Sequence, residues 1–286
     1  MQIIRLIILS SFLFISCKKD TPVKSSIDPD NVTDTTIKKE ATNSKLNKLA
    51  KQLSGLWINS SYLDSIKVSK SISKSRNYYS DILGFYLYEE NLLSEKSSIW
   101  GFTENEGGYT YPIKYNTDTN NFIFDVSRKN EYPEEMDFSM YLKKDKLEIM
   151  YTIPKRKKIL YTRISHSKNI DELDYELNHI LFEGTYVDSI TQKEFIFQRN
   201  GTVKGFDSIT NYELQYNFVV ELKPIDMIFL SSSDEPYSDL YHYEIKDDKI
   251  MLYSNRSYPD EKTEDEFIPE TGYIIEEKPT FILMKK

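Results

Sequence analysis

Alternation of apolar and polar residues runs through most of the chain after residue 54 and predicts many short β-strands. The segment "LEIMYTI" (147–153) carries an apolar residue at every second position. The segment "KEFIFQRNGTVKGF" (193–206) contains two apolar stretches around Asn200 and Gly201, which predict a tight hairpin because both residue types tolerate positive φ. A polar turn, "TDTNN" (117–121), separates two further apolar stretches. Strands this short and closely spaced favour antiparallel barrels or sandwiches.

The same order of elements occurs twice along the chain. A short helical pattern precedes a strand that begins with glycine, and a hairpin and a final apolar strand follow later. The matching segments are 44–53 with 169–181, 141–152 with 243–254, and 158–164 with 280–286. A repeat of this kind predicts two similar domains in tandem rather than one large one. We predict an all-β fold of two tandem antiparallel β-barrels, each preceded by a short helix, with domains at 45–165 and 166–286.

The N-terminus has the pattern of an export signal. Arg5 is followed by apolar residues to position 15, and then by Ser16 and Cys17. The apolar run is shorter than the roughly 20 residues that a membrane span needs, so we interpret residues 1–16 as a signal peptide. Cys17 is the only cysteine of the 286 residues. The body of the protein therefore has no disulfides and no thiolate metal sites.

The segment "LFISC" (13–17) resembles the lipobox of bacterial lipoproteins. This resemblance implies that Cys17 is acylated, becomes the first residue of the mature chain, and attaches the protein to a membrane of the cell envelope, at either face of the outer membrane. Lys18, Lys19 and Asp20 resemble the surface-export tag of some Bacteroidota lipoproteins. The alternative is a buried or reactive thiol. Residues 17–44 are polar and lack periodicity, so we predict a lipidated cysteine followed by a disordered tether.

Two glycine–aromatic pairs lead to a second resemblance. Gly55 and Trp57 open the first predicted strand of one copy, and Gly184 and Tyr186 open the corresponding strand of the other. A short helix followed by this opening, and by a meander that ends in a strand with a basic residue, resembles the lipocalin-type barrel. In that family a basic residue of the last strand covers the aromatic ring and closes the barrel. The resemblance assigns this structural role to Arg163 for Trp57, and to Lys285 for Tyr186.

The charge balance argues against a nucleic-acid partner. Removal of residues 1–16 takes away only Arg5, so 36 of the 37 basic residues face 45 acidic ones and the formal charge becomes −9. The 22 tyrosines and 15 phenylalanines are typical of strands and clefts. The aromatic run "GFYLYEE" (84–90) places Phe85 and Leu87 on one face and Tyr86 and Tyr88 on the other, and leaves open whether the second face lines a cavity.

A search for chemistry finds no catalytic motif, and we predict no enzyme activity, cofactor or metal. Three histidines, His166, His179 and His242, lack the spacing of metal ligands. Acidic loops could offer oxygens to Ca²⁺, but solvated surface loops are the simpler interpretation. Their carboxylates are Asp234, Glu235, Asp239, Asp260, Glu261, Glu264, Asp265 and Glu266.

Three classes of function stay open. The first is a non-catalytic lipoprotein that binds a small apolar or amphipathic ligand inside a barrel, which is our main hypothesis. The second is a structural or interaction protein with filled barrels, such as an accessory of an envelope complex or an inhibitor. The third, an envelope hydrolase, lacks any motif in its favour.

Overall fold

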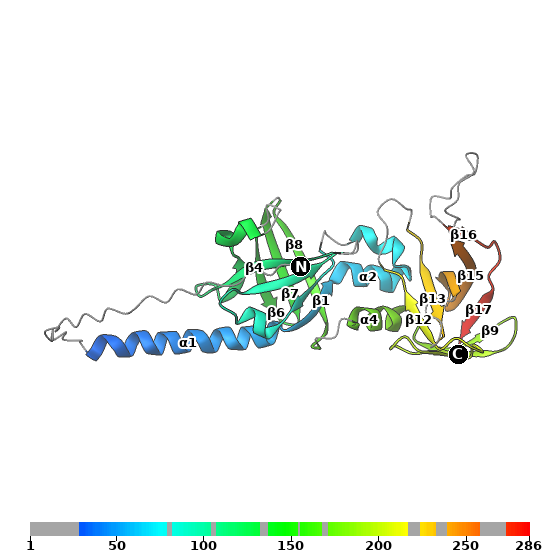
Figure 1. Ribbon diagram of the computed structural model, residues 1–286, viewed down its shortest axis with the longest axis horizontal. Coiled ribbons are helices and arrows are strands. Elements are labelled where there is room, and N and C mark those ends of the chain that lie inside the picture. The colour runs from blue at the N-terminus through cyan, green and yellow to red at the C-terminus, as the bar shows by residue number, and fades with distance from the viewer. Residues whose placement is uncertain are drawn as a thin grey trace, which may run out of the picture. The chain divides into compact units, whose positions relative to one another are not determined.

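The structure is a computed structural model of the chain, shown in Figure 1. It describes residues 29–78, 82–103, 107–131, 137–153, 155–167, 171–216, 224–232, 239–257 and 273–286. The first helix, α1 (Pro29–Leu53), leads into two antiparallel barrel-like sheets, one after the other along the chain.

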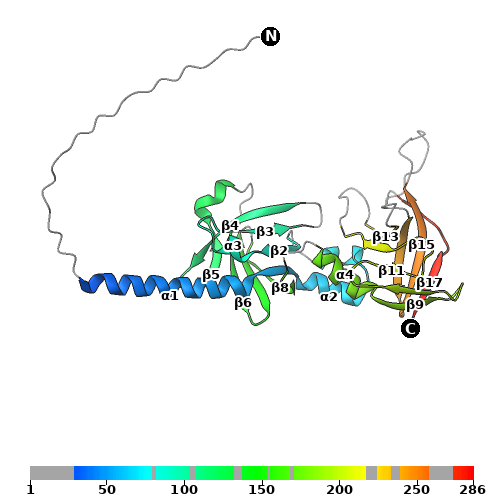
Figure 2. The ribbon, with the colours of Figure 1, turned by 60° about the horizontal axis from the view of Figure 1, so that its bottom comes forward.

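The first sheet is a closed barrel of eight strands (Figure 2). Each strand pairs with the next one in sequence, and the last pairs back with the first. The strands are β1 (Gly55–Asn59), β2 (Gly84–Leu87), β3 (Ser98–Phe102), β4 (Gly108–Asn116), β5 (Asn121–Phe124), β6 (Asp137–Lys143), β7 (Lys146–Ile153) and β8 (Lys157–Ser165). The connections carry α2 (Ser60–Ser69), η1 (Ser73–Tyr78), α3 (Glu89–Leu92) and η2 (Val126–Glu131).

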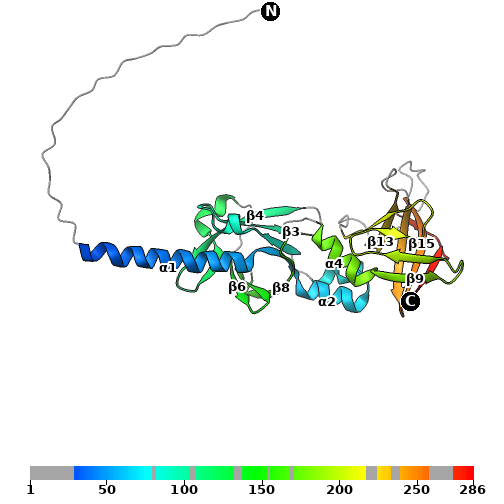
Figure 3. The same cartoon turned by 90° about the horizontal axis from the view of Figure 1, so that it is seen from below.

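The second sheet follows α4 (Glu172–Leu181) and is nearly closed (Figure 3). Its strands are β9 (Gly184–Asp188), β10 (Glu194–Phe197), β11 (Val203–Lys204), β12 (Asn211–Leu214), β13 (Met227–Ser231), β14 (Asp239–Lys246), β15 (Lys249–Ser257), β16 (Tyr273–Ile275) and β17 (Phe281–Lys285). The order is β11-β10-β9-β17-β15-β14-β13-β12, with β16 paired to β15. A single bridge between Thr202 and Asn211 joins the two ends.

The two sheets repeat the same neighbours. The hairpin β6–β7 corresponds to β14–β15, and β8 and β1 correspond to β17 and β9. The matched turns use positive φ in both copies, at Lys144 and at Asp247 and Asp248. Gly201 also has positive φ, as its hairpin requires. The predicted all-β fold with two barrel units, each preceded by a helix, is therefore confirmed.

The first helix is longer than the sequence pattern predicts, and this corrects part of the predicted tether. The pattern predicted a helix from residue 44 and disorder over 17–44, but α1 begins at Pro29. Proline suits the first position of a helix because its fixed φ matches and its missing N–H is not needed there. Leu46, Leu49 and Leu53 anchor the last turns on the barrel, and elongation from an anchored turn is favourable even for polar residues. Residues 1–28 lie outside the described part of the chain.

The inside of the first barrel is filled by its own side chains. Phe85 and Leu87 point inward with Trp57, and all three are fully buried. Aromatic rings pack edge to face across this core, with Phe85 5.1 Å from Tyr161 between ring centroids. The other buried members are Leu49, Ala50, Leu53, Ile82, Leu92, Ile99, Tyr111, Ile113, Phe122, Phe124, Phe138, Met140, Leu147, Ile149, Tyr151 and Ile159.

The core of the second barrel includes residues from outside its own strands. Three residues of α2, Tyr62, Leu63 and Ile66, belong to the same buried cluster as Phe197 and Leu230 of the second sheet. The helix α4 contributes Leu173, Leu177 and Leu181 to this cluster. The helices α2 and α4 lie side by side next to the second barrel (Figures 1 and 3). Helix α2 is therefore an insertion in one barrel that completes the core of the other.

Candidate functional site

The residues expected to close the first barrel meet in space. Trp57 and Arg163 are register partners on β1 and β8, and Arg163 Cζ lies 4.5 Å from the centroid of the indole ring. Trp57 is fully buried, and its Nε1 donates to Leu53 O at 2.7 Å. Gly55 has φ +133°, and a Cβ there would lie 2.2 Å from Ser165 O. This arrangement fixes the start of β1 against β8 and holds the end of α1 on the barrel.

The second barrel has a similar arrangement at the matched positions. Tyr186 and Lys285 are register partners on β9 and β17. Gly184 has φ +154°, and a Cβ there would lie 3.3 Å from Lys285 Cε. Burial, together with the charge of Asp248, raises the pKa of Tyr186 to about 12. Tyr186 therefore stays neutral at physiological pH.

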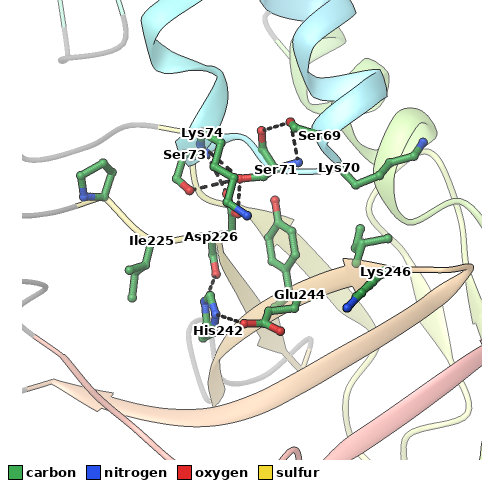
Figure 4. Close-up of a pocket in the computed structure, with 13 residues that line it drawn as sticks. Ser69, Lys70, Ser71, Ser73, Lys74, Ile225, Asp226, His242, Glu244 and Lys246 are labelled. Atoms are coloured by element: carbon green, nitrogen blue, oxygen red, sulfur yellow. Dashed lines mark hydrogen bonds and ion pairs between the residues drawn. The ribbon is translucent and has the colours of Figure 1, made fainter.

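A polar cavity of about 410 Å³ lies where the segment after α2 meets the second barrel (Figure 4). One wall is the segment 69–74, which comes from the connection between β1 and β2. The other wall is formed by residues 224–226 and by β14. Ser69, Ser71 and Ser73 line the first wall, and His242 and Glu244 line the second. The cavity is thus lined by polar residues from two parts of the sequence that are about 150 residues apart.

Asp226 connects the two walls of this cavity. Its carboxylate accepts from Ser71 Oγ at 2.5 Å and from Ser73 N at 2.7 Å. Asp226 is only 7% exposed, so these bonds replace the water that a buried carboxylate would otherwise need. Ser71 Oγ also accepts from Lys74 N at 3.1 Å, which fixes the turn that begins η1. The carboxylate holds the segment after α2 against the second barrel.

His242 is oriented by the backbone. Its Nδ1 donates to the carbonyl oxygen of Asp226 at 2.9 Å, so the proton is placed on Nδ1. Its Nε2 lies 3.8 Å from Glu244 Oε1. The Ser71 hydroxyl donates to the Asp226 carboxylate and not to the His242 imidazole. These three residues therefore do not form the hydrogen-bonded relay of a serine hydrolase.

Three lysines line the cavity. Lys70 Nζ donates to Ile180 O at the end of α4, at 3.2 Å. Lys74 stands on the wall after α2 and Lys246 on the β14 wall (Figure 4). The lining thus contains three lysines and two carboxylates, those of Asp226 and Glu244, and the ammonium group of Lys70 is bound to α4.

The second face of the aromatic run also lies at the meeting of the two barrels. Tyr86 packs 5.1 Å from Trp100 and 5.4 Å from Phe102 between ring centroids, and belongs to the core shared with α2 and α4. Near it, burial and the charges of Glu213 and Asp171 raise the pKa of Asp174 to about 7, although a hydrogen bond from Tyr216 lowers it. Tyr86 and Tyr88 therefore pack against the core shared by the two barrels. This answers the question of whether their face of the aromatic run lines a cavity.

The other candidate residues do not meet in one place. His166 Nδ1 contacts the Arg163 guanidinium at 3.1 Å, and His179 pairs with Glu183 on the surface of α4. Cys17 lies outside the described residues, as do most of the acidic-loop candidates: Asp234, Glu235, Asp260, Glu261, Glu264, Asp265 and Glu266. Asp239 is exposed at the start of β14.

The sequence analysis found no metal-ligand spacing around His242 and gave no role to Asp226 or to Lys74. No local pattern marks Asp226, because its hydrogen-bond partners Ser71 and Ser73 lie 155 and 153 residues away along the chain. Within the described residues, no group of three or more His, Cys, Asp or Glu side chains is placed to hold a metal ion. No described helix has the length and apolar content needed to cross a membrane.

Comparisons with known proteins add no identity. No family model, no curated protein and no solved structure matches this chain.

Proposed function

We propose that the chain is an exported, lipid-anchored, non-catalytic protein of the cell envelope, at the outer membrane, that acts by binding a partner protein. The observation that carries this proposal is the packing of both barrels. Their interiors are occupied by core side chains, and the second is completed by α2. A barrel filled in this way is a scaffold, and its surface is then the place for recognition. Membership of the lipocalin-like family stays a prediction.

One surface feature supports a partner of acidic chemistry. The hairpin between β7 and β8 carries four consecutive exposed basic residues, Lys155, Arg156, Lys157 and Lys158. Of these, Lys158 pairs with Glu148 at 3.4 Å. Leu160, on the same strand as Lys158, is 40% exposed. A basic tip with an apolar neighbour fits an acidic protein surface.

A second candidate is the binding of a small apolar or amphipathic ligand by the second barrel. Phe206, Phe281 and Tyr241 are only partly buried against the core, and their rings form one group with the fully buried Phe195. Rings of this kind could face an apolar guest. The envelope-hydrolase alternative has less support, because no sequence motif favours it.

The anchor is tested by Cys17→Ser. We expect the variant to be released from membranes and the wild type to carry an acyl label. Acyl chains contribute about 0.8 kcal/mol per buried methylene, so their loss removes the anchoring energy. Membrane retention of the variant together with an unlabelled wild type would contradict lipidation.

The binding mode is tested by native mass spectrometry of the released Cys17→Ser protein, purified from its own host without detergent. A co-purifying protein that is lost in the double variant Lys155→Glu, Lys157→Glu supports the interaction proposal. The control, Lys48→Glu, alters an exposed lysine of α1 instead. A co-purifying small molecule and no protein would favour the apolar-ligand candidate.

A further inference from the structure

The cavity at Asp226 is lined by two lysines, Lys74 and Lys246, that form no ion pair with any of the described residues. Across the described residues, several lysines have an acidic partner: Lys143 and Lys158 share Glu148, and Lys193 pairs with Asp207. Lys74 and Lys246 line one cavity from opposite walls, and neither makes an ion pair within the part of the chain that the structure describes. Because acidic residues outnumber basic ones, 45 to 37, unpaired ammonium groups that share a cavity are notable.

The two carboxylates of the cavity do not form ion pairs with Lys74 or Lys246, because each has another partner. Both oxygens of Asp226 are used by Ser71 Oγ and Ser73 N. Glu244 lies beside His242 Nε2, at 3.8 Å. An anion that enters the cavity would therefore meet the ammonium groups without displacing an existing ion pair.

The uncharged groups of the walls fit an oxyanion that carries hydroxyls. His242 has its Nδ1 proton committed to a carbonyl, so Nε2, which lies 3.8 Å from Glu244 Oε1, is left to accept from a ligand hydroxyl. On the other wall, Ser69 Oγ donates to Ser71 O at 3.1 Å and Ser73 Oγ lies 3.2 Å from Ser71 Oγ, so these two hydroxyl oxygens can accept from a ligand hydroxyl. A volume of about 410 Å³ suits a small organic molecule, since ligand pockets run from about 300 to 1,000 Å³.

We propose that this cavity binds a small organic phosphate, whose phosphate group is held between the ammonium groups of Lys74 and Lys246. A phosphate monoester carries close to two negative charges at neutral pH and three acceptor oxygens, which matches two unpaired ammonium groups. Lys70 lines the same cavity, but its ammonium group is held by the carbonyl of Ile180 and is not assigned to the phosphate. This site is independent of the proposed partner surface on the β7–β8 hairpin.

The test is isothermal titration calorimetry of the full mature chain carrying Cys17→Ser, with glycerol 3-phosphate and inorganic phosphate as probes in chloride buffer. We expect saturable binding of glycerol 3-phosphate. Lys74→Gln and Lys246→Gln should each weaken it at least tenfold, because each removes one charge-assisted contact. The matched control is Lys249→Gln, an exposed lysine on β15 outside the cavity, which should bind like the wild type.

Vesicles that contain phosphatidic acid distinguish a lipid headgroup from a soluble phosphate. Vesicle binding that depends on Lys74 and Lys246, without binding of either soluble probe, assigns the phosphate to a lipid. Absence of binding to all three probes would overturn the proposal. Equal binding by the two cavity variants and the control would do the same, provided that all variants keep the wild-type circular dichroism and melting temperature.

Discussion

At the scale of single residues, buried carboxylates join segments of the second barrel that are distant in sequence. Asp188 is fully buried at the end of β9. It accepts from Thr191 N and Thr191 Oγ1, at 2.9 and 2.7 Å, and from Ile282 N of β17, at 3.0 Å. Burial alone raises the pKa of Asp188, but the hydrogen bonds from Thr191 and Ile282 outweigh it and hold that pKa below its usual range.

We predict that Asp188→Ala lowers the free energy of unfolding by about 2–4 kcal/mol at pH 7, because three donors lose their charged acceptor. A depressed folded-state pKa stabilises the protein above the unfolded value of about 3.9, and this stabilisation is lost as the pH falls through the folded value. The difference between wild type and variant should therefore shrink below about pH 4. Urea denaturation at pH 7, 5 and 3 measures it.

The control for this prediction is Asp207→Ala. Asp207 is exposed and, among the described residues, forms an ion pair with Lys193 at 2.6 Å. Exposed ion pairs contribute little to stability. The control should unfold at the same urea concentration as the wild type. An equal loss of stability in both variants would contradict the role assigned to Asp188.

At the scale of elements, α2 is the segment whose position matters most. It follows β1 directly, and Asn59 caps it by accepting from Ser61 N at 3.0 Å. It ends at Lys70, whose φ of 52° turns the chain toward Asp226. One face of the helix is buried in the core of the second barrel, while Val68 on another face is 86% exposed. The helix therefore links two barrels that have separate sheets.

We predict that Ile66→Ala destabilises the protein by about 2–5 kcal/mol, since it leaves a cavity in a packed core. Hydrogen exchange should accelerate in β13 and β14, which belong to the other barrel. Val68→Ala, on the same helix, should change the stability by less than about 0.5 kcal/mol. Faster exchange confined to β1 and β2 in the Ile66 variant would show that α2 does not support the second barrel.

At the scale of the whole described body, residues 42–286 form one compact unit that contains both sheets. Two barrels joined only by a linker would unfold independently. Here the core of the second barrel includes α2 and the outer face of the first, through Leu56, Ile58 and Tyr86. Loss of either barrel exposes the apolar surface of the other, which couples their stabilities.

We therefore predict one cooperative unfolding transition for the whole chain. Both tryptophans, Trp57 and Trp100, lie on strands of the first barrel, but Trp100 packs against the core shared with the second barrel. The measurement therefore uses the Trp100→Phe variant, in which the fluorescence of Trp57, buried inside the first barrel, reports on that barrel. Circular dichroism in the β region reports on both. The two signals should have the same urea midpoint, as two-state unfolding requires. Separate midpoints would show that the barrels unfold independently.

Local features of the sequence determined the strands, their turns and the duplication. Period-two alternation shows which residues face inward, and pairs such as Asn200 and Gly201 mark a turn because only few residue types accept positive φ. Gly55 and Trp57 could be aligned with Gly184 and Tyr186 because each pair opens a strand directly after a short helical pattern. These signals act over a few residues, so they survive without knowledge of distant neighbours. The extent of α1 was missed, because anchored helices grow through polar residues.

Only the tertiary structure decided how the two barrels are joined and where a polar cavity lies. Ser71 and Asp226 are 155 residues apart, and nothing near either one indicates the other. Helix α2 has the pattern of any amphipathic helix, and the sequence does not say which barrel its apolar face covers. Hydrophobic burial is non-directional, so the partner of an apolar face is chosen by the packing of the complete chain. The same packing brings Lys74 and Lys246 to one cavity from opposite walls.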